Sequence, residues 1–280
     1  MQNRFHVFAR SLRCFTTSSS NGSGSATNQN IIRSGGKSSY IGFGKFEGMG
    51  GEEGSLSKAL EYLKDALNVH TTAEKSPENR RTEARYHHDI AMCHHRSGEI
   101  EHAISEYKTT IKLLNDLICE TPNSTENVNI IKRSRFDVSS AYSGLSVAFA
   151  DQMSDNEALD YALKALEIRK SLMGPNHASV AECLNNLGGL YFRQSSFNKA
   201  AEVYQESLRI LLTKTGGKEE NKYVALAYYN IGLTYDKLGL KKGTDAVQKA
   251  LLIANHIWGP NHDQTIQISQ TFQDMQKRTS

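Results

Sequence analysis

The chain has 280 residues with 38% hydrophobic and 22% charged side chains, and its 33 basic and 30 acidic residues give a formal net charge of +3. The whole surplus lies in residues 1–46, which hold six basic residues and no acid, so residues 47–280 carry −3 and give no support to nucleic-acid binding. No apolar run approaches the roughly 20 residues that cross a bilayer. Four cysteines without a CxxC pair predict reduced thiols.

Residues 1–15 have the composition of a mitochondrial transit peptide. They are basic and free of acid, and Phe5, Phe8 and Leu12 recur at helical spacing while arginines occupy the other faces. An arginine stands three residues before Thr16, as in a common processing site, so cleavage is expected there. These features predict a mitochondrial protein, in the matrix or associated with the inner membrane. Another organelle, or a basic tail on a cytoplasmic protein, is the alternative.

Residues 16–54 are predicted to be a disordered linker. Serine and threonine dominate residues 16–39, and eight glycines lie between positions 35 and 54. Such a segment cannot bury enough apolar surface to offset the entropy of the chain. A resemblance to a phosphate-binding loop at residues 36–38 fails because Ile31 stands where the first glycine of that loop is required.

From residue 55 onward, pairs of amphipathic helices recur with one internal pattern. In the clearest copy, at residues 181–210, Leu184 and Gly188 line the first helix, and Ala200 and Tyr204 line the second. Small residues let the two helices of a pair pack closely, and each pair must stack on the next to bury its remaining apolar face. The small residue of the first helix recurs at intervals of 55, 42 and 44 residues, as Ala91, Ser146, Gly188 and Gly232.

These residues resemble the tetratricopeptide repeat family, in the subtype of kinesin light chains, whose period is near 42 residues. The stretch at residues 165–181 is similar to the connection and helix start of that subtype, and Gly174-Pro175-Asn176-His177 recurs as Gly259-Pro260-Asn261-His262. The resemblance covers residues 55–280. It implies an all-α, right-handed α-solenoid of stacked antiparallel helix pairs, with about four repeats and a C-terminal capping helix over residues 263–277.

The chain departs from kinesin light chains in two places. Residues 1–54 show no heptad repeat, so the coiled coil that binds the motor chain in that family has no counterpart. The 55-residue step between the first two repeats contains an insertion around residues 120–132. We expect this insertion to extend the following helix, with Ser124 or Thr125 as its N-cap.

The resemblance places a partner-binding groove along the first helices of the repeats. Asn186 and Asn230 occupy the same repeat position, and an amide can both donate to and accept from a peptide backbone, so the resemblance implies a clamping role. Arg96, Arg193 and Lys237 also share one position and predict a basic edge that favours an acidic partner peptide. The full set of candidate groove residues is Arg85, His88, Met92, Arg96, Asn185, Asn186, Arg193, Tyr229, Asn230 and Lys237.

Histidines gather between His87 and His95, which raises the alternative of a metal-dependent protein. Because His87 and His94 fall on the packed face of their helix, at most one pair can converge, and no metal or cofactor is predicted. No nucleophile elbow or paired-carboxylate pattern indicates an enzyme. The sequence therefore predicts a non-enzymatic scaffold that binds a protein or peptide, with a role in assembling or maintaining a mitochondrial complex. A cytosolic cargo adaptor like the kinesin light chains is the other alternative.

Overall fold

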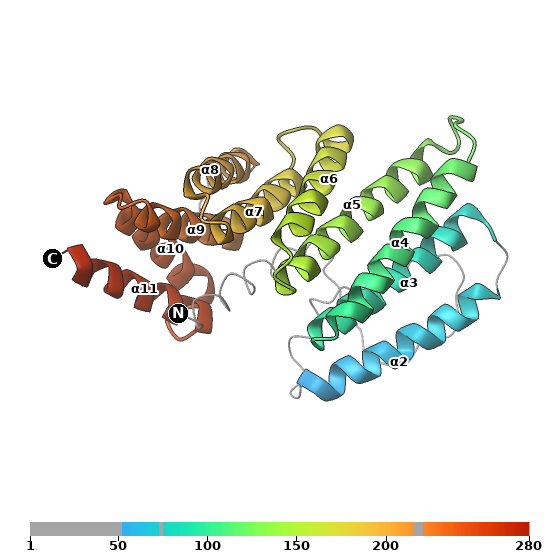
Figure 1. Cartoon of the computed structure of the whole chain (residues 1–280), viewed down its shortest axis with the longest axis horizontal. Helices are drawn as coiled ribbons and strands as arrows, with labels where there is room; N and C mark the ends of the chain where they lie inside the picture. The colour runs from blue at the N-terminus through green and yellow to red at the C-terminus, as the bar shows by residue number, and fades with distance from the viewer. Residues whose placement is uncertain (1–51, 73–74, 215–220, 280) are drawn as a thin grey trace.

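The computed structural model describes residues 52–72, 75–214 and 221–279, and these residues form ten helices and no strand (Figure 1). The predicted transit peptide and nearly all of the predicted linker lie outside this range. The helices are α2 (Glu52–Thr71), α3 (Pro77–Arg96), α4 (Ile100–Glu120), α5 (Val128–Asp151), α6 (Asp155–Met173), α7 (Ala178–Arg193), α8 (Phe197–Lys214), α9 (Lys222–Lys237), α10 (Lys242–Trp258) and α11 (Asp263–Thr279). None of them is long and apolar enough to cross a membrane.

The helices are arranged as a row of antiparallel pairs. The most extensive contacts join α3 to α4, α5 to α6, α7 to α8 and α9 to α10, and we call these pairs units 1 to 4, each with an A helix followed by a B helix. Each B helix also contacts the A helix of the next unit, so that the units stack along one direction (Figure 1). The predicted all-α solenoid is confirmed. Helix α2 packs on α3 as a B helix would, and α11 packs on α10 as an A helix would.

The turn between the A and B helices is the same in all four units. One residue adopts a positive φ, namely Gly98 (80°), Met153 (62°), Ser195 (57°) and Gly239 (70°). The amide that follows it donates to the carbonyl five residues earlier, as from Glu99 N to His94 O at 2.9 Å. This is the Schellman arrangement, which satisfies the last carbonyls of the A helix and reverses the chain. The turn residues are spaced by 55, 42 and 44 residues, as the sequence pattern predicts.

The connections from B helices to the next A helices come in two lengths. Seven residues separate α4 from α5 and α8 from α9, whereas four residues separate α6 from α7 and α10 from α11. Both short connections have the sequence Gly-Pro-Asn-His. Their glycines end the B helix at φ 83° and 82°, and proline prevents its continuation. The Nδ1 atoms of His177 and His262 then accept the amides of Ser179 and Gln264, each at 3.2 Å, so these histidines are N-caps.

Two helix starts differ from the sequence-based expectation. The N-cap of α5 is Asn127 rather than Ser124 or Thr125, because the carbonyl of Ser124 accepts the amides of Asn127 and Val128 in a turn that delays the helix. Helix α2 begins at Glu52, so residues 52–54, predicted as linker, are helical. Adding a residue to an existing helix costs much less than starting one, and glutamate is a good helix former.

The two helices of a unit are held together by a close contact in unit 3. A Cβ atom built on Gly188 would lie 2.6 Å from Cε1 of Tyr204, whose side chain is 0% exposed. On the next turn of α8, Ser207 donates its hydroxyl to the carbonyl of Ala181 on α7 at 2.7 Å. Glycine at position 188 therefore sets the distance between α7 and α8, in agreement with the expected role of this small residue.

Candidate partner-binding face

All candidate residues lie on the A helices, but only some of them, among them Asn186, Arg193, Asn230 and Lys237, are on the side turned away from their own B helices. On α7, Gly188 contacts α8, and at 100° per residue Asn186 and Arg193 lie on the opposite side of the helix. We call the corresponding sides of α3, α5, α7 and α9 the A face. Direct contacts between α3 and α5 and between α7 and α9 make this face continuous within each of these helix pairs.

Two of the candidate amides bind each other. The Nδ2 atom of Asn230 on α9 donates to Oδ1 of Asn185 on α7 at 2.9 Å, and both side chains are buried. This bond joins the A helices of units 3 and 4, so the pair has a structural role in addition to any contact with a partner. The sequence places these asparagines 45 residues apart, and only the stacking of the units brings them together.

Asn186, the residue after Asn185 on α7, differs from this pair in its hydrogen bonding. Its side chain is 4% exposed, and its Oδ1 atom is buried and accepts no hydrogen bond from the described part of the chain. A buried amide oxygen without a donor is unusual, since most buried polar atoms are paired. Asn186 therefore has a buried amide oxygen whose hydrogen-bonding capacity is unused in the described part of the chain.

Tyr229 on α9 makes the corresponding link to the last helix. Its hydroxyl lies 3.1 Å from Oγ1 of Thr271 on α11, and its ring packs with Ile268 and Met275 of the same helix. Tyr229 is buried, so it stacks α9 on α11 and does not present an open aromatic surface.

The predicted basic edge is interrupted. Arg193 forms an ion pair with Asp155 of α6, 2.9 Å from Nη2 to Oδ1, and the equivalent residue of unit 2 is the acidic Asp151, which contacts Nε2 of His95 at 2.9 Å. The charge of Arg193 is thus largely balanced within the protein. Arg96 in unit 1 and Lys237 in unit 4 remain exposed at the two ends of the row.

Three candidate residues of unit 1 are less buried than the asparagines and the tyrosine of units 3 and 4. Arg85, His88 and Met92 are half-buried on α3. The ring of His88 meets the edge of Tyr107 with 5.4 Å between ring centroids, and Met92 packs on the cluster around Ala91 and Tyr107. His88 and Met92 thus contribute to the packing of α3 on α4 as well as to the A face.

The histidines between positions 87 and 95 bind separate carboxylates. His87 Nδ1 lies 2.6 Å from Glu106, and this hydrogen bond lowers the pKa of Glu106. His95 bonds to Asp151, and His94 contacts Glu99 at 2.6 Å. Residues 87–95 by themselves therefore do not bring three metal ligands together in the described part of the chain.

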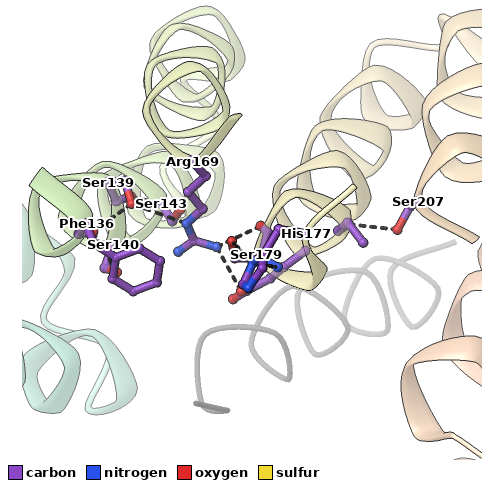
Figure 2. Close-up of polar contacts among 10 residues, drawn as sticks. Phe136, Ser139, Ser140, Ser143, Arg169, His177, Ser179 and Ser207 are labelled. Atoms are coloured by element: carbon purple, nitrogen blue, oxygen red, sulfur yellow. Dashed lines mark hydrogen bonds and ion pairs between the residues drawn. The ribbon is translucent and has the colours of Figure 1, made fainter. Parts of the chain in front are cut away.

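Arg169 is a buried residue to which the sequence analysis gave no role. It lies on α6 with 4% of its surface exposed and reaches from α5 to α7, as Figure 2 shows. Its Nε atom donates to Ser139 Oγ at 3.3 Å, its Nη1 atom donates to Ser179 O at 3.1 Å and to Glu182 at 2.8 Å, and Phe136 covers the guanidinium at 5.4 Å (Figure 2). Burial raises the pKa of Glu182, and Arg169 acts against that rise. Arg169 thus ties unit 2 to unit 3.

Comparison with known proteins agrees with this arrangement. Residues 137–213, from α5 to α8, match the family model described as tetratricopeptide repeat. No curated protein matches the chain. Residues 137–213 thus match this family, and the described residues as a whole fold as an α-solenoid of the kind that tetratricopeptide proteins form.

Three solved structures illustrate the similarity of fold. BtubC (BKLC) of P. vanneervenii is 21% identical with a TM-score of 0.58, over 76% of this chain and 78% of that one. A signal transduction ATPase of Pyrococcus horikoshii with a tetratricopeptide repeat sensor is 20% identical with a TM-score of 0.59, over 78% of this chain and 29% of that one. The nearly identical TPR-like repeats of a kinesin light chain from Podosopora anserina are 13% identical with a TM-score of 0.52, over 74% of this chain and 90% of that one.

Proposed function

We propose that this protein is a non-enzymatic scaffold that binds a peptide or helix of a partner protein along the A face of units 3 and 4. The tetratricopeptide match and the solenoid fold support a protein-interaction module. The observation that carries the proposal is the buried Oδ1 atom of Asn186, which lies beside the Asn185–Asn230 pair and has no donor in the described chain. Rotation of the amide group turns this oxygen to the surface, where a backbone N–H of a bound peptide supplies the missing donor.

Two of the three cysteines in the described part of the chain are unsuited to act as nucleophiles. Cys93 and Cys183 are buried, and burial raises the pKa of each to about 11. Both therefore stay protonated at neutral pH and are poor nucleophiles.

The partner segment is proposed to be acidic. Lys237 is exposed on α9, seven residues and two helical turns beyond Asn230. A peptide whose backbone reaches Asn186 can therefore meet Lys237 with a carboxylate, whereas Arg193 has to leave Asp155 to do so. The binding is expected to weaken with added salt, because exposed charges are screened.

Asn186→Ala is expected to weaken the capture of the partner about three- to tenfold and to leave the melting temperature unchanged. One neutral hydrogen bond contributes about 0.5–1.5 kcal/mol, and the variant breaks no bond of Asn186 Oδ1 within the described protein. The partner is first identified by proximity labelling in cells, and its segment is then titrated against purified variants by isothermal calorimetry.

The exposed Asn198 on the B helix α8 provides a matched control, since Asn198→Ala removes the same amide from another face. Lys237→Glu is expected to lower the affinity further and to flatten its dependence on salt. A partner that binds Asn186→Ala as tightly as the wild type would place the binding surface elsewhere and contradict the proposal.

The site of action is proposed to be mitochondrial, in the assembly or maintenance of an organellar complex. Support comes from the basic, acid-free sequence of residues 1–15, which lie outside the described residues. N-terminal sequencing of the endogenous protein is expected to find a mature chain that starts near Thr16. An intact Met1 on protein recovered from the cytosol would contradict the mitochondrial address and favour the cytosolic cargo adaptor.

A further inference from the structure

The turn between α3 and α4 brings together two histidines and a glutamate. His94 is on the last turn of α3, Glu99 follows the turn residue Gly98, and His102 is on the first turn of α4. One Oε2 atom of Glu99 lies 2.6 Å from Nδ1 of His94 and 3.4 Å from Nδ1 of His102. One potential ligand atom from each residue lies within 4.8 Å of the other two, and no other group of this kind occurs among the described residues.

The other three units show that the fold does not require these residues. The shared turn residue fixes the equivalents of His94, Glu99 and His102 at four residues before it, one after it and four after it. The equivalent triplets are Phe149, Ser154 and Glu157 in unit 2, Tyr191, Ser196 and Lys199 in unit 3, and Tyr235, Leu240 and Gly243 in unit 4. In each of these three units, a phenylalanine or tyrosine stands four residues before the turn residue and packs in the hydrophobic core. Unit 1 instead has an imidazole there, together with two further ligand-type residues within reach.

The donor set has the chemistry of a zinc site. Two imidazole nitrogens and a carboxylate oxygen are ligands of zinc, with bonds of about 2.0–2.2 Å, so that neighbouring ligand atoms of a tetrahedral site lie about 3.3 Å apart. The 3.4 Å separation of His102 and Glu99 already has this value, whereas the 2.6 Å hydrogen bond between His94 and Glu99 has to open for the ion to enter. The side chain of His94 is 10% exposed and is held in place, whereas those of Glu99 and His102 are 47% and 73% exposed and are free to adjust.

We propose that His94, Glu99 and His102 bind one Zn²⁺ ion, or a similar first-row divalent ion, at the turn of unit 1. The exposed side of the site leaves the fourth position to water. Because His94 belongs to α3 and His102 to α4, the ion joins the two helices of the unit beside the end of the A face that carries Arg96.

Equilibrium dialysis with Zn²⁺ alone tests this site on the full chain, produced without a histidine tag and stripped with EDTA. The wild type is expected to bind one ion per chain and to melt at a higher temperature with Zn²⁺. Glu99→Ala and His102→Ala are each expected to lower the affinity at least about tenfold, since even residues that only orient a ligand change metal affinity by about 10–100-fold. Bound Co²⁺ should give visible d–d absorption in the wild type that His102→Ala abolishes.

His87→Gln is the matched control, because His87 lies on the same helix but bonds to Glu106 outside the triad. It is expected to bind Zn²⁺ as the wild type does. The proposal is overturned if the wild type binds no stoichiometric ion, if His102→Ala binds it with unchanged affinity, or if His87→Gln loses it. Because His102 is largely exposed, its replacement is not expected to disturb folding. A loss of Zn²⁺ binding in this variant therefore reports on the site itself.

Discussion

Arg169→Met is expected to lower the free energy of unfolding by about 3 kcal/mol. Removal of one partner of a buried ion pair costs about 3–5 kcal/mol, because the other charge is left without compensation. Glu182 keeps 19% of its side chain exposed, which favours the lower end of this range. The variant also loses the hydrogen bond to Ser179 O and the cover of the guanidinium by Phe136. Urea denaturation followed by circular dichroism measures the change.

The same variant has a pH signature. Burial raises the pKa of Glu182, and this rise is unopposed once Arg169 is gone. The folded variant then binds a proton more tightly than the unfolded chain, so its stability falls as pH rises from the ordinary pKa of glutamate through the raised one. Arg169→Met should therefore be least destabilised at acidic pH, and Glu182→Gln in the same chain should recover part of the loss at neutral pH.

Lys170→Met serves as the control for Arg169→Met, since Lys170 is the exposed neighbour on α6. Its effect should stay within about 0.5 kcal/mol, as for most surface substitutions. If Arg169→Met were no more destabilising than this control, Arg169 would not be the link between units 2 and 3.

Gly188→Leu is expected to cost about 3 kcal/mol, at the upper end of the range for overpacked cores. Even a Cβ atom at this position would lie 2.6 Å from the ring of Tyr204, and that ring has no exposed surface into which it could move. Gly188→Ala should act in the same direction with a smaller loss. Thermal and urea unfolding of both variants measure the effect.

A double variant separates the contact from other causes. Tyr204→Ala alone creates a cavity, but combined with Gly188→Leu it gives the new side chain room. The combined loss should be smaller than the sum of the two single losses by about 0.5–3 kcal/mol, the range for residues in contact. Additive losses would show that Gly188 and Tyr204 do not meet.

The fold follows from the sequence because its determinants are local. The small residue of the A helix, the positive-φ turn and the Gly-Pro-Asn-His connection each act within a few residues, and their spacing reveals the units. The cap of α5 escaped prediction because Ser124, Thr125 and Asn127 are all good N-caps, and the competing turn at Ser124 is not visible in residue type.

The candidate site depends on residues far apart in the chain, and the sequence predicts it less well. Helical position placed Asn186 and Arg193 on one face, but it could not show that Arg193 is paired with Asp155 or that Asn185 is bound by Asn230. The burial of Arg169 could not be predicted from the sequence for the same reason. Arginine on a B helix is ordinarily exposed, and only the stacking of unit 3 on unit 2 buries it.

The two lengths of connection between units divide the solenoid into segments with different tolerance to change. In both four-residue joints, glycine ends one helix, proline stops it and histidine caps the next. In the first joint, Asn176 also accepts a hydrogen bond from Arg209 at 2.7 Å. An added residue is therefore expected to disturb the glycine end of one helix or the histidine cap of the next. The seven-residue joints at 121–127 and 215–221 lack this motif, and loop closure changes slowly with length. Among homologous proteins, changes in length are therefore expected at those two joints, whereas the segment α5–α8 between them should keep its length.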